Sequence, residues 1–388
     1  MERPATRSAQ AGAARHDFAI AHLPEAPADP AAAVQSLMSA IADQLSELAA
    51  DRADVARVCL FLPGPLSFER AEPLVADALG DPPPPFELLA QPVAGGGAAA
   101  LTWLVSGDGV SVDRLDATSA RVAQPEAELV VVGHGPAEPP TSTAADFAVG
   151  LRRFDARLRD AGLPLGLGNA IKLWTVFPST PELGTEQAFN EFNRGRAGVF
   201  DEVEFERDDA GPLYPASTGV GALDNTAPLS GIALARQVRT LRVENPAQVS
   251  AFRYPSERIA TPALFSRAIA LDLGSDVMTF VAGTGSTVGS KTAHVGDPAA
   301  QAEQVLTNID RLITAENLAR SGAPVAAGGL ATLSHIVVYA ADEPSEAAAR
   351  DVCERIVPPE VPMVLVRSRL TRDELLVEAD GVAYAPRA

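Results

Sequence analysis

The sequence predicts an α+β protein, in which short strands and amphipathic helices follow one another along 388 residues. Residues 277–282 are apolar and rich in β-forming side chains, as expected of one buried strand. A glycine-rich turn over 283–289 follows, and Asp297-Pro298 then supplies the N-cap and first residue of a helix. That helix carries an apolar stripe at helical spacing, namely Val305, Leu306, Ile309, Leu312 and Ile313. Together these elements predict a place where a small molecule lies against a sheet.

The glycine-rich turn resembles a phosphate-binding loop only superficially. Five residues separate Gly283 from Gly289, whereas a phosphate loop has four residues between its first glycine and the glycine-lysine pair. Ser290 also intervenes before Lys291. We therefore interpret the glycines as a tight turn and the floor of a ligand site, because glycine lets a ligand approach the backbone closely.

Composition and charge limit the classes of partner. The formal net charge of −19 argues against nucleic acid and anionic membranes, which both require a basic face. No run of about 20 apolar residues is present to span a membrane, and the N-terminus lacks an apolar signal core, so we expect a cytoplasmic protein. Cys59 and Cys353 do not form a disulfide framework or a metal-binding spacing, and we expect both to be small buried side chains.

The chain is long enough for two or three domains, and we expect four segments. Residues 1–15 are small and polar and are expected to be disordered. Residues 16–163 form an N-terminal α+β domain without evident chemistry, in which His134 is expected to be structural. A middle unit spans 164–243, and a C-terminal domain spans 244–388.

The middle unit contains two closely spaced arginines, Arg194 and Arg196, on either side of a glycine. In so acidic a chain they suggest a carboxylate clamp, because a guanidinium group binds a planar carboxylate through two parallel hydrogen bonds. The alternative is a solvated helix end. The sequence leaves both interpretations open.

The C-terminal domain ends in a predicted strand that carries Glu378. Alternation along this strand places Glu378 on the same face as Leu376. A carboxyl group on a largely apolar face has its pKa raised by desolvation, which suits a general acid. The alternative is an exposed glutamate on an edge strand.

Several motifs carry a family resemblance. Residues 244–388 resemble the RidA (YjgF) fold through Phe265-Ser266-Arg267-Ala268, the strand and turn over 280–286, Asn308-Ile309, and residues 375–379. Residues 165–388 are similar to the chorismatases, which are built on that fold. The shared motifs are Trp174, Phe177-Pro178, residues 193–196, residues 214–221, Tyr254-Pro255 and the loop 283–289.

The resemblance implies RidA/YjgF-like (chorismate-mutase-like) β-sheet domains with helices packed on one face, repeated as a pseudo-trimer. The chain is then a monomer built of three units, or a homo-oligomer. It also implies cleavage of chorismate, a dianionic enolpyruvyl ether, with pyruvate as one product and no cofactor or metal. Glu378 matches the family's catalytic glutamate and would protonate the methylene carbon. Candidate partners of the substrate's carboxylates are Arg194, Arg196, Arg207, Arg267 and the hydroxyl of Tyr254.

In the family that this sequence resembles, two positions differ between subtypes that form different products. One subtype has alanine at the position of Gly285 and an aliphatic residue seven before the glutamate, and it forms a dihydroxycyclohexadiene carboxylate. Another pairs glycine with cysteine and forms 3-hydroxybenzoate. This chain has Gly285 and Thr371, and we expect the space at Gly285 to favour 3-hydroxybenzoate. Arg258-Ile259 is a further departure, because the family has tyrosine and glycine there.

Other functions stay open. These are hydrolysis to the diene, formation of 4-hydroxybenzoate, imine deamination of the RidA type, and non-catalytic binding of a small molecule. An imine deaminase would need an arginine at the start of the closing strand, where Pro362 and Met363 lie instead.

Overall fold

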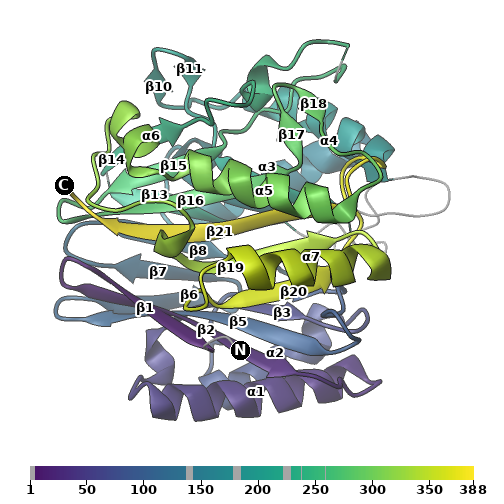
Figure 1. Cartoon of the computed structure of the whole chain (residues 1–388). Helices are drawn as coiled ribbons and strands as arrows, with labels where there is room; N and C mark the ends of the chain where they lie inside the picture. The colour runs from purple at the N-terminus through teal and green to yellow at the C-terminus, as the bar shows by residue number, and fades with distance from the viewer. Residues whose placement is uncertain (1–4, 137–142, 178–184, 222–228, 237, 258) are drawn as a thin grey trace.

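The computed structural model describes residues 5–136, 143–177, 185–221, 229–236, 238–257 and 259–388. Three large sheets make up the chain, and each has its own helices (Figure 1). We call them, with these helices, units A, B and C in chain order. Arg258, one of the two expected departures from the family pattern, lies outside the described residues.

Unit A is a five-stranded sheet of order β1-β2-β5-β3-β4, with helices α1 and α2. Helix α1 begins after Asp29, whose side chain accepts from the backbone N–H of Ala31, and it buries an apolar stripe that includes Leu37 and Ile41. The elements are β1 (Thr6–Ala11), β2 (Ala14–Leu23), α1 (Pro30–Glu47), β3 (Val55–Phe61), α2 (Phe68–Leu79), β4 (Phe86–Leu89) and β5 (Ala98–Gly107).

Unit B is a six-stranded sheet of order β12-β9-β13-β8-β7-β6, with helices α3 and α4. Helix α3 starts with a capping box between Thr143 and Asp146. The elements are β6 (Ser111–Asp116), β7 (Ser119–Ala123), β8 (Glu128–Val132), α3 (Ala144–Asp160), β9 (Ala170–Phe177), α4 (Thr185–Phe200), β12 (Ala216–Gly221), β13 (Leu229–Arg236) and the small hairpin of β10 (Arg207–Asp208) and β11 (Gly211–Pro212).

Unit C is a six-stranded sheet of order β14-β15-β16-β21-β19-β20, with α5 and α7 packed on it. The expected strand and helix are confirmed as β16 and α5, with Asp297 capping the helix. The expected turn over 283–289 is wrong in extent, because the strand continues through Gly285 and a short strand follows at Thr287–Val288. The elements are β14 (Arg239–Val243), β15 (Ala268–Asp272), β16 (Asp276–Gly285), β17 (Thr287–Val288), β18 (Lys291–Thr292), α5 (Pro298–Leu312), α6 (Ala315–Arg320), β19 (Leu333–Ala340), α7 (Glu343–Ile356), β20 (Met363–Arg367) and β21 (Val377–Pro386).

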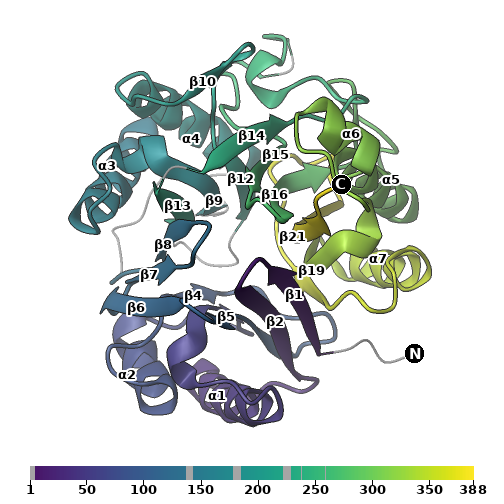
Figure 2. The ribbon, with the colours of Figure 1, turned by 90° about the vertical axis from the view of Figure 1, so that its left-hand side faces the viewer.

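The three units repeat one architecture around a common centre. Figure 2 shows the sheets turned inward and the helices on the outside. Each sheet contains a parallel pair of strands, which are β3–β4, β9–β12 and β19–β20. One apolar cluster, with Phe18, Val131 and Phe280 among its members, joins the inner faces of all three sheets. Separate clusters fill the space between each sheet and its helices. The expected α+β class with repeated sheet-and-helix units is confirmed.

The expected domain limits are wrong in three places. Strands β6, β7 and β8 belong to the sheet of unit B, since β8 pairs with β13, so this unit begins near residue 111 and not at 164. Strand β14 pairs with β15 and belongs to unit C, which therefore starts before residue 244. Within 1–15, β1 is ordered against β2. Small polar residues form an edge strand there through backbone pairing, which composition does not reveal.

The cysteines and His134 are structural, as expected. Cys59 and Cys353 are buried and unbridged. His134 accepts a hydrogen bond from the backbone N–H of Leu88 on Nδ1 (3.1 Å), and burial lowers the pKa of its imidazole to about 4. Of the helices within the described ranges, none has the length and hydropathy needed to span a bilayer.

Candidate active site

A buried cavity lies between units B and C, and we call it the site cavity. Helix α4 and strand β12 of unit B line one side, and β16, β21 and the segment before β21 line the other. About 580 Å³ of space in and around it, open solvent included, is free of protein atoms. Aromatic side chains form much of the wall: Phe177, Phe189, Phe192, Tyr254 and Phe265.

Glu378 faces this cavity from strand β21, and its side chain is almost wholly buried. Its backbone pairs with Gly285 on β16. A Cβ atom on Gly283 would lie 2.2 Å from Glu378 Oε1, so the absent side chain at Gly283 makes room for the carboxyl group. Glycine is needed here for space and not for an unusual backbone conformation.

Burial raises the pKa of the Glu378 carboxyl to about 8, and the negative charge of Asp380 acts in the same direction. The positive charges of Arg372, Lys172 and Arg267 oppose the shift. Glu378 therefore holds its proton at neutral pH. The desolvated carboxyl expected from the sequence is confirmed, and the alternative of an exposed edge glutamate is wrong.

Arg196 lines the same cavity, and it has no anionic partner among the residues that the structure describes. Its side chain is 1% exposed, and its guanidinium group donates to Asn193 Oδ1 (2.6 Å) and lies over the ring of Phe192. Its Nε atom has no hydrogen-bond partner. Desolvation lowers the pKa of Arg196 to about 9. Leaving a buried cation without a counter-ion is costly, so this arrangement is typical of an anion site.

Arg267 is a second buried arginine that lines the site cavity. It is 4% exposed and donates to the hydroxyl of Tyr254 and to the carbonyl of Val249, while its Nε atom has no partner. The carboxyl of Glu244 accepts from the backbone N–H of Arg267 (3.2 Å). Across the described part of the chain, no ion pair involves the guanidinium of Arg196 or of Arg267. The cavity thus presents two arginines with unused N–H groups.

Two of the arginines expected at the site do not reach it. Arg194 is largely exposed and forms an ion pair with Glu191 on its own helix. Arg207 is exposed in the β10–β11 hairpin. Residues two apart on a helix point about 200° away from each other, so Arg194 and Arg196 cannot both face one cavity. The clamp inferred from their closeness in sequence is therefore wrong for Arg194.

Thr371, Gly285 and Tyr254 do line the cavity, as expected. The backbone of Gly285 lies against Leu375, because a Cβ atom there would come within 3.2 Å of Leu375 Cδ2. A methyl group at this position would therefore press first on Leu375, which is itself part of the wall.

The sequence reasoning missed several lining residues. Arg372 lies over the ring of Tyr254 and contributes a third guanidinium group. Its position in the sequence, six residues before Glu378 and next to Thr371, could have predicted that Arg372 belongs to the site. Phe189 and Phe192 are three apart on α4 and so share a face, but that spacing is equally typical of an ordinary core.

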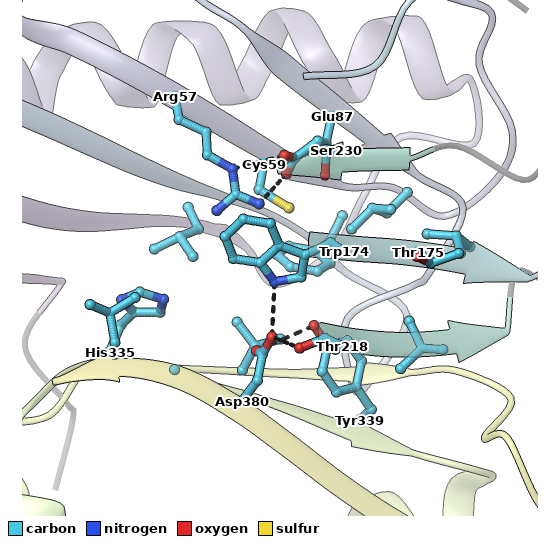
Figure 3. Close-up of a pocket in the computed structure, with 18 of the residues that line it drawn as sticks. Arg57, Cys59, Glu87, Trp174, Thr175, Thr218, Ser230, His335, Tyr339 and Asp380 are labelled. Atoms are coloured by element: carbon cyan, nitrogen blue, oxygen red, sulfur yellow. Dashed lines mark hydrogen bonds and ion pairs between the residues drawn. The ribbon is translucent and has the colours of Figure 1, made fainter. Parts of the chain in front are cut away.

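A second cavity lies at the centre of the three sheets, and we call it the axis cavity (Figure 3). Arg57 on β3 donates to both oxygens of Glu87 on β4 (2.8 and 2.6 Å) and stacks on the ring of Trp174. Asp380 on β21 accepts from the indole N–H of Trp174 (2.9 Å). No signal in the sequence pointed to these charged residues, because they come from units A and C and meet only in the folded chain.

The charged groups at the axis cavity form ion pairs, Arg57 with Glu87 and Asp380 with Lys172. Arg57 is matched by Glu87, and burial lowers the pKa of the His335 imidazole beside them to about 3, so that this ring is neutral. Within the described ranges, no group of three His, Cys, Asp or Glu side chains could hold a metal ion. The arrangement at the axis is that of a polar core joining the units.

The fold and the site cavity define a class of protein: three sheet-and-helix units in one chain, with a protonated carboxyl group and unpaired arginines at one of the unit interfaces. A crystal structure of a chorismatase matches with a TM-score of 0.65 over 94% of this chain and 98% of that protein, at 22% sequence identity. The chain therefore has the chorismatase fold.

Curated relatives carry related names. The chain is 32% identical over 224 residues to a 3-hydroxybenzoate synthase of Streptomyces hygroscopicus, and 34% identical over 223 residues to a chorismatase of Streptomyces rapamycinicus. Each match covers 56% of this chain and 64% or 65% of the relative, so the chain spans less than two thirds of either. No protein-family model matches the sequence.

Proposed function

We propose that this protein is a chorismatase, which cleaves chorismate to pyruvate and a hydroxybenzoate. The observation that carries the proposal is the pairing of a protonated Glu378 with two buried, unpaired arginines in one cavity. A dianionic enol ether needs both, since its carboxylates require cations and its cleavage requires an acid. The names of the curated relatives support the same reaction.

In the proposed reaction, Glu378 gives its proton to the methylene carbon of the enolpyruvyl group. The resulting oxocarbenium ion weakens the ether bond to the ring, and that bond breaks with its electrons moving to the ether oxygen, which leaves as the carbonyl oxygen of pyruvate. The ring hydroxyl moves to the vacated carbon, and a ring C–H proton returns to Glu378 as the ring becomes aromatic. The products contain all the atoms of chorismate, so no water is consumed.

The surrounding residues bind and orient the substrate in this proposal. Arg196 and Arg267 receive its carboxylates through charge-assisted hydrogen bonds, with the hydroxyl of Tyr254 as a further donor. The aromatic wall contacts the ring and excludes water. Exclusion of water favours internal rearrangement over hydrolysis.

We further propose 3-hydroxybenzoate as the product. Gly285 leaves Leu375 in place against β16, whereas a methyl group at 285 would push Leu375 toward the ring. Thr371 lines the same cavity and differs from the residues of both subtypes. The alternatives are 4-hydroxybenzoate, in which the oxygen stays on its carbon, and the dihydroxycyclohexadiene carboxylate, which would take up one water.

The direct test is to incubate the purified protein with chorismate and to separate the products by chromatography against hydroxybenzoate and diene standards. Pyruvate and 3-hydroxybenzoate in equal amounts are expected. Chorismate labelled with oxygen-18 at its ring hydroxyl should yield labelled 3-hydroxybenzoate. Calorimetric binding of chorismate without turnover would make the protein a binding protein, and release of ammonia from imines without chorismate cleavage would make it an imine deaminase.

The oligomeric state and location are part of the proposal. One chain already supplies three units around one centre, so we propose that it acts as a monomer, which analytical ultracentrifugation would test. The two free thiols fit a reducing compartment, and we propose the cytoplasm.

A further inference from the structure

Asp380 occupies the boundary between the site cavity and the axis cavity. It follows Glu378 by two residues in β21, so both carboxyl groups point to the same face of the sheet. Glu378 lines the site cavity, whereas Asp380 lines the axis cavity, where Figure 3 shows it directed at Trp174 and Thr218. A negative charge on Asp380 therefore acts on the carboxyl group of Glu378, although the Asp380 side chain does not line the site cavity.

The surroundings of Asp380 are those of a carboxylate anion. Its Oδ2 atom accepts from the indole N–H of Trp174 (2.9 Å), from the ammonium group of Lys172 (3.2 Å) and from the hydroxyl of Thr218. The hydroxyl of Tyr339 lies 3.5 Å from Oδ1. Three donors therefore converge on one oxygen of Asp380.

Lys172 makes its hydrogen bonds to Asp380 and to the groups around it, and its positive charge also acts on Glu378 against the raised pKa. It is wholly buried, and its ammonium group donates to Thr218 Oγ1 (2.7 Å) and the carbonyl of Val281 (2.7 Å), besides Asp380. These three acceptors use all three of its N–H bonds. Thr218 in turn accepts from Lys172 and donates to Asp380, which closes the network.

The arginines that line the site cavity favour loss of the proton from Glu378, and a nearby negative charge opposes that loss. Arg196 on α4, Arg267 before β15 and Arg372 before β21 line this cavity, and a carboxyl group beside cations normally loses its proton. The same arginines that suit the substrate's carboxylates would therefore ionise the acid that must protonate it. From β19, Tyr339 adds a neutral hydroxyl, and from β9 Lys172 adds a further positive charge, whereas Asp380 is the carboxylate whose charge raises the pKa of Glu378.

We infer that Asp380 is a positioning residue that keeps the catalytic proton on Glu378. Its fixed negative charge, held by Lys172, Thr218 and Trp174, opposes ionisation of Glu378 within a cationic cavity. The polar core that joins the three units thereby also sets the protonation state of the acid. The inference rests on the proposed function, in which Glu378 is the proton donor.

Asp380→Asn tests the inference because it removes the charge with little change of shape. Activity requires protonated Glu378, so kcat/KM should be full at low pH and should fall as pH rises through about 8 in the wild type. In Asp380→Asn the midpoint of this fall should move to lower pH by about one unit or more, as expected for loss of a nearby like charge. Asp272→Asn is the matched control, since Asp272 is a buried, ion-paired aspartate on β15 of the same sheet.

A second measurement does not depend on turnover. The infrared difference spectrum between wild type and Glu378→Gln isolates the carbonyl stretch of protonated Glu378. Its pH midpoint should move with that of kcat/KM in Asp380→Asn and stay at the wild-type value in Asp272→Asn. Should Asp380→Asn fail to fold, Asp380→Ser removes the same charge with a smaller side chain, and it should shift the midpoint in the same direction.

The outcomes separate the two proposals. Unchanged midpoints in Asp380→Asn, or in Asp380→Ser if it alone folds, would overturn the role of Asp380 and leave Glu378 as the acid. An active wild-type enzyme whose Glu378 shows no protonated band at neutral pH would overturn the acid role itself.

Discussion

The site cavity and the axis cavity are both buried and both contain arginine, yet they differ in how that charge is neutralised. At the axis, Arg57 is bound through two hydrogen bonds to Glu87 and stacked on Trp174. In the site cavity, Arg196 has only the amide oxygen of Asn193. A paired buried ion is stabilised within the fold, whereas an unpaired buried cation is typical of an anion site, as we propose for Arg196. Burial alone therefore does not identify the functional cavity. The pairing of its charges does.

The sharpest test of this comparison replaces one glutamate in each cavity by glutamine. Glu378→Gln should lower kcat by about 10²–10⁴-fold with the fold intact, because the amide keeps the shape but cannot protonate carbon. Glu87→Gln should leave kcat near the wild-type value and lower the free energy of unfolding, since Arg57 loses its anionic partner. Steady-state kinetics and urea unfolding measure the two effects. A Glu378→Gln enzyme that keeps more than about a third of wild-type kcat would remove Glu378 from the acid role.

The next effect concerns the space in which the acid sits. Gly283→Ala should lower kcat by about 10²-fold, because its methyl group would collide with Glu378 Oε1 and with the backbone of Thr218, and a misplaced acid loses most of its effect. Gly198→Ala on α4 is the matched control, since nothing lies within 4 Å of the added methyl group. Equal kcat values for the two variants would show that Glu378 acts from a different position.

Arginine substitutions should separate binding from stability. Arg196→Met should raise KM about ten- to a hundredfold, as expected for loss of a charged hydrogen bond, with little loss of stability because no anion is left unpaired. Arg57→Met should instead lower the free energy of unfolding by about 3–5 kcal/mol and leave KM unchanged. The exposed Arg194→Met serves as a control for both measurements. If Arg196→Met destabilises the protein as much as Arg57→Met, Arg196 is a structural residue.

The smallest expected effect is on the product ratio. Gly285→Ala should shift the mixture toward the diene, since its methyl group presses on Leu375 and crowds the rearranging ring. Thr371→Cys should favour 3-hydroxybenzoate. Product chromatography at full conversion measures both. A wild-type enzyme that forms only the diene would show that Thr371, and not the space at Gly285, decides the product.

Local sequence patterns predicted the parts of this protein whose interactions are close along the chain. The β16 strand, the α5 helix capped by Asp297 and the apolar setting of Glu378 all follow from side-chain periodicity and capping. The unit limits did not, because β8 and β13 pair across about 100 residues of intervening chain. Arg194 and Arg196 are two residues apart in the sequence, yet the rotation of the helix between them points their side chains in different directions.

The sequence by itself determined the class of each element and the chemistry of the candidate acid, since both depend on short-range backbone preferences and on the burial that an apolar pattern implies. Only the tertiary structure decided which charges meet. Arg57, Lys172 and Asp380 come from units A, B and C and are brought together at the centre of three sheets. Coulombic and hydrogen-bond energies depend on distance in space, which a linear sequence does not contain. The unpaired state of Arg196 and the network around Asp380 exist only once the three units have packed together.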